Sequence, residues 1–370
     1  MKAIILAAGK STRMNSDMPK VLQPVMGKPM LHYVIEACKG ADIDEIIVVV
    51  GHMGGDVREA SGGYGVQFVT QAERLGTGHA VMAASDFIVL DEDIIVLCGD
   101  TPLVTPELLR DIKENFTGRA GTDALIVSVK TDSPFNYGRV IKDGDAFVKI
   151  IEQLDLPKEL EPVNEINTGI MCFKGGALLY GLSKINNLNK KGEYYLTDVP
   201  AVLKESGREA AVYVYGGHCD ECLGINTKTQ LAAAAAVMRR RINEKHMESG
   251  VTMADPQTCY IDAAVKIGRD AVLLPNVILE GGCEIGCGAI IGPGARLTDT
   301  KVGEGSSVQY SVANGAAIGS GTSVGPFAYL RPGAEVGDGC KIGDFVEIKN
   351  AAVGNGSKVP HLAYVGDADV

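Results

Sequence analysis

The feature that most constrains the fold is a six-residue period in the C-terminal part of the chain. A large aliphatic residue recurs at every sixth position from Ile261 to Leu297. After a five-residue step to Val302 and an irregular stretch, the period resumes from Ile318 to Ile348. Each six-residue unit of such a repeat forms one flat side of a triangular coil, with the aliphatic residue inside. The sequence therefore predicts a left-handed parallel β-helix over residues 251–370.

The first part of the chain has a different pattern, in which short apolar runs alternate with stretches of helical periodicity. Apolar runs at residues 3–8, 45–50, 94–98 and 124–129 are separated by helical patterns such as 30–39 and 106–115. This alternation predicts a Rossmann-like, mostly parallel sheet with helices on both faces, a fold of the α/β class. Ligands of such sheets bind beyond the carboxyl ends of the strands.

A helical stretch separates the two patterns. Residues 227–250 are rich in alanine, arginine and glutamate and contain no glycine or proline before Gly250, which predicts a helix of about six turns. We therefore expect three parts: an α/β domain over residues 1–226, a linker helix over 227–250, and the β-helix over 251–370.

Composition excludes several classes of partner. The net charge is −11, and the one basic block is the run of three arginines at 239–241, which argues against nucleic acid or an anionic membrane as partner. No segment approaches the roughly 20 apolar residues of a membrane span, and none is typical of a secretion signal. Nine scattered cysteines suggest reduced thiols and a cytoplasmic location.

The first apolar run ends in a loop of small and basic residues. A buried strand runs into Gly9, and the cations Lys10 and Arg13 follow, a combination that suits phosphate. The P-loop pattern fails because Ile4 stands where its first glycine is needed, and G-x-G-x-x-G fails because Ser11 replaces the second glycine. The loop pattern alone leaves a phosphate site and a plain strand-to-helix turn as alternatives.

Motifs spread over the whole chain give it a family resemblance. They are KAIILAAGKSTRM at the start, QAERLGTGHA from Gln71, GDTP from Gly99, YGR from Tyr137, EINTG from Glu165, EYYLTD from Glu193, GIN from Gly224, LRPG from Leu330, EIKN from Glu347 and HLAY from His361. The first part resembles sugar-1-phosphate nucleotidyltransferases. The whole chain resembles the bifunctional bacterial N-acetylglucosamine-1-phosphate uridyltransferases/glucosamine-1-phosphate acetyltransferases, although Ser11 departs from the family's G-x-G-T-R-M loop.

The resemblance implies two reactions that serve cell-envelope synthesis, including peptidoglycan and lipopolysaccharide. The first transfers UMP from UTP to N-acetylglucosamine 1-phosphate and releases pyrophosphate. The second acetylates glucosamine 1-phosphate with acetyl-CoA; because the family's acetyl-CoA contacts lie mostly beyond residue 370, we expect this activity to be weak or absent. The resemblance also implies a homotrimer.

The resemblance assigns roles to residues of the first part. Arg13 and Lys20 would be catalytic, bracing the triphosphate as fixed positive charge. His79 is expected to pack or cap a helix start rather than to act as a base. The nucleotide would contact Leu6, Ala7, Ala8, Gly9, Lys20, Gln71, Gly76 and Thr77. The sugar would contact Gly138, Glu152, Asn167 and Asn226.

Phosphoryl transfer between two anions calls for a divalent cation. Asp100 directly follows an apolar run, and with the amide oxygen of Asn226 it is the expected Mg²⁺ ligand set, because hard oxygen ligands suit magnesium. The alternative is that Asp100 binds no metal and only forms a turn or caps the N-terminus of a helix.

The repeat region carries the residues expected for acetyl transfer. His361 is the candidate base, and Arg331, Lys349 and Tyr364 would hold the sugar phosphate. The alternative is a repeat that serves only as an oligomerisation post.

Two other functions stay open at this point. One is a nucleotidyltransferase for another sugar phosphate, and the other is a non-catalytic regulatory subunit of the same architecture. Such subunits tend to lose the loop cations or the metal ligand, whereas Arg13, Lys20, Asp100 and Asn226 are all present.

Overall fold

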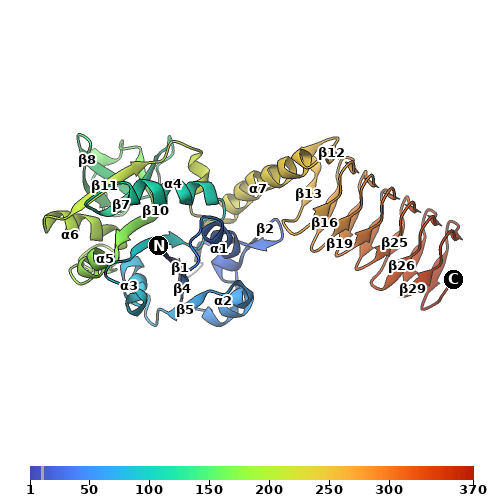
Figure 1. Cartoon of the computed structure of the whole chain (residues 1–370), viewed down its shortest axis with the longest axis horizontal. Helices are drawn as coiled ribbons and strands as arrows, with labels where there is room; N and C mark the ends of the chain where they lie inside the picture. The colour runs from blue at the N-terminus through green and yellow to red at the C-terminus, as the bar shows by residue number, and fades with distance from the viewer. Residues whose placement is uncertain (10–11) are drawn as a thin grey trace. The chain divides into compact units, whose positions relative to one another are not determined.

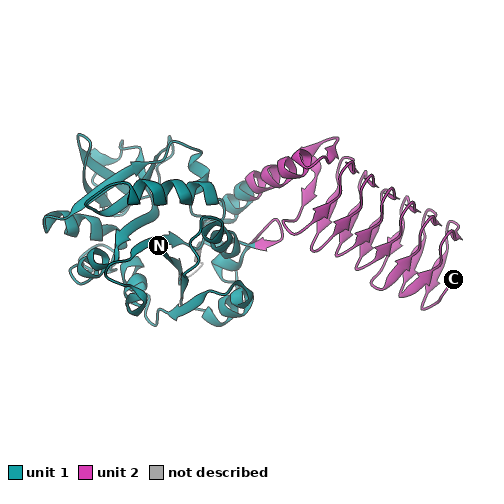
Figure 2. Ribbon diagram, in the orientation of Figure 1, with its two compact units in different colours: residues 1–23, 29–234 teal, residues 24–28, 235–370 magenta. Residues whose placement is uncertain are grey.

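The chain forms two compact units. The computed structural model describes residues 1–9 and 12–370, so Lys10 and Ser11 lie outside the described residues. The first unit consists of Met1–Gln23 and Pro29–Ala234, and the second consists of Pro24–Lys28 and Ala235–Val370 (Figures 1 and 2).

The first unit is built on one large sheet with the strand order β11-β7-β10-β6-β1-β4-β5 (Figure 1). Only β10 runs antiparallel to its neighbours on this path. The strands are β1 Lys2–Ala7, β4 Ile46–Val50, β5 Gln67–Thr70, β6 Asp93–Cys98, β7 Thr122–Lys130, β10 Glu165–Lys174 and β11 Glu209–Val214. The hairpin of β8 Arg139–Asp143 and β9 Ala146–Ile151 joins the sheet through β10. The predicted mostly parallel sheet is confirmed.

Helices cover both faces of this sheet, as predicted. Along β1, Ala3 and Ile5 enter one hydrophobic core and Ile4 enters the other, because successive side chains of a strand point to opposite faces. The first core includes residues of α1 Met30–Gly40, α2 Gly54–Ser61 and α4 Pro106–Thr117. The second includes residues of α3 Thr77–Met82, α5 Gly175–Leu182 and α6 Val199–Glu205.

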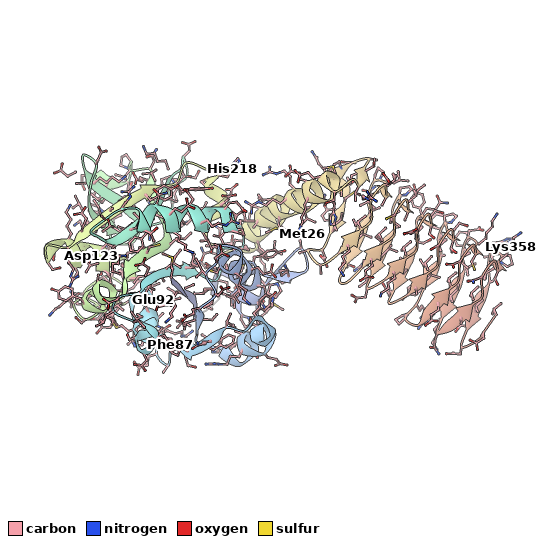
Figure 3. The ribbon with its side chains drawn as sticks, in the orientation of Figure 1. Met26, Phe87, Glu92, Asp123, His218 and Lys358 are labelled. Carbon is pink, nitrogen blue, oxygen red and sulfur yellow. The ribbon has the colours of Figure 1, made fainter. Side chains whose placement is uncertain are left out.

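Polar groups at the amino end of β1 are paired. The nearly buried ammonium of Lys2 donates to the backbone oxygen of Phe87 at 2.9 Å and lies 3.0 Å from a carboxylate oxygen of Glu92, two residues labelled in Figure 3. Burial lowers the pKa of this ammonium, but its hydrogen bonds to Glu92 and Glu45 outweigh that effect and leave the pKa raised.

The helix predicted at residues 227–250 is confirmed as α7 Lys228–Glu248, and Gly250 follows it with a φ of 96°. The division between the units falls inside α7, after Ala234. The short strands β2 Pro24–Val25 and β3 Lys28–Pro29 enclose Met26, which Figure 3 labels. The backbone oxygen of Met26 accepts from the backbone nitrogen of Ala263 at 3.0 Å. The three-part division at residues 226 and 250 stays a proposal.

The second unit contains three parallel sheets that together form the predicted β-helix (Figure 1). The first sheet holds β12 Thr252–Met253, β15 Val272–Leu273, β18 Ile290–Ile291, β21 Ser307–Val308, β24 Ser323–Val324, β27 Lys341–Ile342 and β30 Lys358–Val359. The second holds β13 Tyr260–Ile261, β16 Ile278–Glu280, β19 Arg296–Thr298, β22 Val312–Asn314, β25 Tyr329–Leu330, β28 Glu347–Lys349 and β31 Tyr364–Gly366. The third holds β14 Lys266–Ile267, β17 Glu284–Ile285, β20 Lys301–Val302, β23 Ala317–Ile318, β26 Ala334–Val336 and β29 Ala351–Val353.

The stretch that breaks the sequence period does not break the β-helix. Val308 and Ala313 are buried in the same core as Val302 and Ile318. The strand pairing shows the cause, because Arg296 pairs with Val312 and Lys301 with Ala317 in shortened coils. The sequence pattern missed Ala313 because alanine is too small to mark an apolar repeat.

Consecutive residues of β18 provide a matched test of this packing. Ile291 is fully buried in the β-helix core, whereas Ile290 is 44% exposed. We expect Ile291→Ala to lower the free energy of unfolding by about 2–5 kcal/mol, because the truncation leaves a cavity. Ile290→Ala should change it by no more than about 0.5 kcal/mol. Guanidinium unfolding of both variants checks this, and equal losses would contradict the assigned orientation of β18.

Candidate active site

A cavity of about 990 Å³ in the first unit gathers most of the predicted site residues. It lies beyond the carboxyl ends of β1 and β6, where Gly9 and Asp100 follow their strands. The predicted residues that line it are Leu6, Ala7, Ala8, Gly9, Arg13, Lys20, Gln71, Gly76, Thr77, Asp100 and Glu152. Of the described residues, Gly138, Asn167 and Asn226 are predicted site residues of this unit that lie outside the lining.

Charged groups converge at one end of the cavity. The ammonium of Lys20 donates to the carboxylate of Asp100 and, at 2.7 Å, to the side-chain oxygen of Asn226. The same oxygen accepts from the guanidinium of Arg13 at 2.7 Å. The backbone oxygen of Asp100 accepts from Ile225 at 2.9 Å, which fixes the loop that carries Asn226. The two predicted metal ligands therefore face one small cationic group.

Among the described residues, no group of three or more His, Cys, Asp or Glu side chains could hold a metal ion. Cys98 also lines the cavity, and burial raises the pKa of its thiol to about 12. Sulfur is a soft ligand, whereas Mg²⁺ prefers hard oxygen ligands. A metal at this site would have few protein ligands. This fits Mg²⁺, which usually keeps waters and substrate phosphates around one or two protein groups.

Gln71 and Gly76 form a second wall of the cavity. The side-chain nitrogen of Gln71 donates to the backbone oxygen of Gly76 at 3.0 Å and lies 3.1 Å from Nδ1 of His79. Gly76 has a φ of 108°, and a Cβ there would lie 2.5 Å from the backbone oxygen of Tyr194. Only glycine fits this position, just before α3. The side chain of Thr77 accepts from the backbone nitrogen of Leu196 at 3.0 Å.

A third wall carries Glu152. Burial raises the pKa of its carboxyl group, and the hydroxyl of Thr197 donates to it at 3.0 Å. Gly138 lies against this carboxylate, because a Cβ on Gly138 would lie 3.4 Å from its Oε1. The backbone nitrogen of Asn167 donates to the oxygen of Gly138 at 2.9 Å. The structure thus brings Gly138, Glu152 and Asn167 together.

Several lining residues were not predicted from the sequence: Val21, Arg74, Ala80, Cys98, Asn136, Gln153, Leu154, Lys191 and Glu193. The buried Arg139 supports one of them directly, since it donates at 3.1 Å to Gln153, and it also donates to the backbone oxygen of Tyr137. Gln153 also accepts from the backbone nitrogen of Asn136 at 3.1 Å. The YGR motif marked this loop in the sequence, but only the structure shows what Arg139 holds.

The predicted acetyl-transfer residues lie on the last coils of the β-helix. The guanidinium of Arg331 donates to Glu347 at 2.9 Å, and Glu347 pairs with Tyr364 along the sheet of β25, β28 and β31. The ammonium of Lys349, in the same sheet, lies 3.3 Å from a carboxylate oxygen of Asp367. His361 lies three residues before Tyr364 and is exposed. These side chains share one region of the β-helix.

The fold and the cavity together define a nucleotidyltransferase domain joined to a hexapeptide β-helix. The family of MobA-like NTP transferase domains matches residues 3–155, and the bacterial transferase hexapeptide family matches residues 264–299 and 315–350. A putative glucose-1-phosphate thymidylyltransferase from Bacillus anthracis, solved with a sucrose, is 25% identical with a TM-score of 0.51 and covers 64% of this chain and 94% of its own. The predicted fold class and the predicted kind of enzyme, a transferase, are confirmed.

Two relatives that align over the whole of this chain have a higher sequence identity than that solved structure. The bifunctional protein GlmU of Caldanaerobacter subterraneus subsp. tengcongensis is 46% identical over 369 residues, and that of Clostridioides difficile is 42% identical over 371 residues. Each alignment covers 100% of this chain and 80% of the relative. The chain belongs to the family of bifunctional GlmU proteins, as the sequence motifs indicated.

Two further findings bear on the environment of the protein. No described helix is long and apolar enough to cross a membrane. All nine cysteines are free thiols.

A carboxyl group behind the Glu152 wall gives the first unit a testable pH dependence. Burial raises the pKa of the half-buried Asp198 to about 6, with repulsion from Glu152 adding to the effect. A raised folded-state pKa means that stability is fully present below the unfolded pKa of about 3.9 and is lost as pH rises through about 6. We expect Asp198→Asn to be more stable than the wild type at pH 7 by about 1 kcal/mol, after allowance for solvent screening.

Thermal unfolding of the wild type and Asp198→Asn between pH 4 and pH 8 measures this effect. The difference between the two proteins should grow as pH rises and vanish at the acid end. Parallel pH profiles would show that Asp198 ionises as it does in the unfolded chain.

Proposed function

We propose that the first unit transfers UMP from UTP to N-acetylglucosamine 1-phosphate, giving UDP-N-acetylglucosamine and pyrophosphate. The observation that carries this proposal is the convergence of Arg13, Lys20 and Asp100, which line a cavity of about 990 Å³, with Asn226, which accepts from Arg13 and Lys20. Family membership and the Gln71 and Glu152 walls support the choice of substrates.

The reaction is an in-line displacement at phosphorus. A phosphate oxygen of the sugar phosphate forms a bond to the α-phosphorus of UTP, and the bond from that phosphorus to the bridging oxygen breaks. Pyrophosphate leaves with the electron pair of that bond. Such a transfer depends on positioning and on neutralising negative charge. Arg13 and Lys20 supply fixed cations, which stabilise the charge that moves onto pyrophosphate.

Asp100 and Asn226 would hold Mg²⁺ in this reaction. Their oxygens both face the ammonium of Lys20, so the pair already accommodates a cation. When bound, Mg²⁺ supplies further neutralisation of the phosphate charge.

The other two walls of the cavity are suited to bind the base of UTP and the sugar of N-acetylglucosamine 1-phosphate. Gln71 presents an amide group that can pair with a pyrimidine edge, beside the backbone of Gly76 and Thr77. Glu152 presents a partly buried carboxylate that can accept from sugar hydroxyl groups, with Gly138 and Asn167 next to it. A non-catalytic subunit is disfavoured, because it would have no need for paired cations around Asp100.

We further propose that the last coils of the β-helix acetylate glucosamine 1-phosphate with acetyl-CoA. His361 would take the proton of the amine as it attacks the thioester carbonyl, and coenzyme A would leave as the thiol. Arg331 and Lys349 offer cations for the sugar phosphate and Tyr364 a hydroxyl group; Lys349 and Tyr364 lie in β28 and β31, and Arg331 directly follows β25 of the same sheet. The expectation that this activity is weak in this chain stays a prediction.

We also propose a homotrimer in the cytoplasm. An exposed column of aromatic rings supports self-association, with 5.9 Å between the centroids of Tyr310 and Phe327 and 5.3 Å between those of Phe327 and Phe345. Association would remove this apolar surface from water. The free cysteines support a reducing compartment.

Asp100→Asn tests the first reaction. We expect uridyl transfer to fall by about 10²–10³-fold, because charge stabilisation at the transferring phosphate is lost. Pyrophosphate release is measured with the four NTPs and several sugar 1-phosphates over a range of Mg²⁺ concentrations. Asp56→Asn, an exposed carboxylate of α2, serves as the control. Unchanged transfer by Asp100→Asn would contradict the assigned role of Asp100.

His361→Ala tests the second reaction. We expect coenzyme A release to fall by about 10²–10⁴-fold, the usual contribution of a general base, while uridyl transfer is unchanged. Release of coenzyme A from acetyl-CoA and glucosamine 1-phosphate is measured for both proteins. The wild-type rate decides whether the activity is weak, and equal rates would contradict the role of His361.

A further inference from the structure

The ammonium group of Lys20 holds the two side chains that are expected to bind Mg²⁺. It donates to the Asp100 carboxylate and, at 2.7 Å, to the side-chain oxygen of Asn226. We propose that, before the nucleotide binds, Lys20 takes the place of a divalent cation between Asp100 and Asn226. Metal binding then requires Lys20 to exchange these partners for another anion, the polyphosphate of the nucleotide. This inference rests on the proposed function.

The side-chain oxygen of Asn226 has both of its lone pairs in use. It accepts from Lys20 at 2.7 Å and from the guanidinium of Arg13 at 2.7 Å, and an amide oxygen has two lone pairs. The amide does not turn over, because its nitrogen would then face two cationic donors, whereas it now donates to the backbone oxygen of Gly224 at 3.3 Å. One of the two cations must therefore leave before this oxygen can bind a metal ion.

Lys20 also blocks the carboxylate of Asp100. It bonds to Oδ2, whereas Oδ1 lies against Gly224, where a Cβ would be 3.1 Å from this oxygen. Mg²⁺ binds about 2.0–2.1 Å from its oxygen ligands, so an ion shared by Oδ2 and the Asn226 oxygen would take the space of the ammonium. The two cations would also repel each other strongly, because Lys20 and Asp100 are mostly buried. The ammonium and the metal ion therefore exclude each other.

The side chain of Lys20 is the part of this group that can move. Asp100 and the loop of Asn226 are joined by their backbones, because Ile225 donates to the backbone oxygen of Asp100 at 2.9 Å. The backbone of Lys20 belongs to the short 3₁₀-helix Lys20–Leu22, but its ammonium stands on a flexible stem. Lys20 lines the cavity, so a swing of this stem can carry the ammonium to phosphate groups bound there.

This exchange of partners couples metal binding to nucleotide binding. Without phosphate groups, displacing Lys20 would leave its ammonium without a counter-charge in a mostly buried place, which is costly. With a nucleotide in the cavity, the phosphate oxygens become the new partners of the ammonium, and the oxygens of Asp100 and Asn226 are released. Such coupling is reciprocal, so the metal raises the affinity for the nucleotide by the same factor.

Lys20→Met tests the exclusion without any turnover. Methionine keeps an unbranched side chain but has no charge, so the oxygens of Asp100 and Asn226 lose the ammonium. Mn²⁺ serves as the probe, because it takes the same kinds of oxygen ligand as Mg²⁺. By electron paramagnetic resonance without nucleotide, we expect Lys20→Met to bind Mn²⁺ about 10–100-fold more tightly than the wild type, the worth of a hydrogen bond to a charged group. Lys20→Gln, also uncharged, replaces Lys20→Met if that variant does not fold.

Lys191→Met is the matched control. Lys191 lines the same cavity, and its loss changes the charge of the cavity by the same amount. We expect this control to bind Mn²⁺ within about twofold of the wild type, because solvent and salt screen an exposed charge. In an Asp100→Asn background, Lys20→Met should bring no gain. With UTP present, the difference between the wild type and Lys20→Met should narrow, because Lys20 then bonds to phosphate.

Four results would each overturn the inference: equal Mn²⁺ affinities of the wild type and Lys20→Met, an equal gain in Lys191→Met, a gain that persists in the Asp100→Asn background, or a difference that UTP leaves unchanged. Pyrophosphate release by the wild type tests the proposed function separately. If the wild type transfers UMP but Lys20→Met gains no affinity for Mn²⁺, the inference alone fails. If Lys20→Met gains affinity but the wild type transfers no UMP, the proposed function fails and the exclusion of metal by Lys20 stands.

Discussion

The bond between the ammonium of Lys20 and the Asp100 carboxylate is the interaction on which the cavity depends. Both side chains are mostly buried, with 15% and 18% of their surfaces exposed. In such surroundings an ion pair is strong, but each charge is costly without its partner. Asn226 completes the group by accepting from Lys20 and Arg13. This network ties together three chain segments, the loop after β1, the end of β6 and the loop before α7. A phosphate ligand would meet charges that are already in position.

The sheet supplies the geometry that this network needs. Neighbouring β1 and β6 are parallel, so the residues after their last positions lie at one edge. At the opposite end of β1, Lys2 is satisfied by Phe87 and Glu92 and offers nothing to a ligand. The polar side chains left for substrate binding are therefore concentrated at the carboxyl edge.

Residues that line the cavity and residues that hold them differ in how they can be found. Gln71, Gly76 and Glu152 stand in motifs that mark the family, so the sequence pointed to them directly. Thr197, Arg139 and His79 each contact a lining residue: Thr197 donates to Glu152, Arg139 donates to Gln153, and His79 contacts Gln71. His79 was expected to pack or cap, and its contact with Gln71 is what the sequence did not predict. A donor and acceptor pair of this kind depends on local geometry and leaves no periodic signal.

Much of the architecture was determined by the sequence alone. The six-residue period predicts the β-helix because each coil must bury an aliphatic residue, and the alternation of apolar runs with helical patterns predicts the layered sheet. The sequence did not predict β8, α5 and α6. All three are short, and the helix propensity of the two helices is low, because α5 begins with two glycines and α6 contains Pro200. Only the tertiary structure decided that Val308 and Ala313 keep the coils in register and that Lys20 meets Asp100 and Asn226. The physical reason is that periodic burial produces a pattern among neighbouring residues, which the sequence displays. Lys20 is 80 residues from Asp100 and 206 residues from Asn226 along the chain, so their contacts form only when the chain folds.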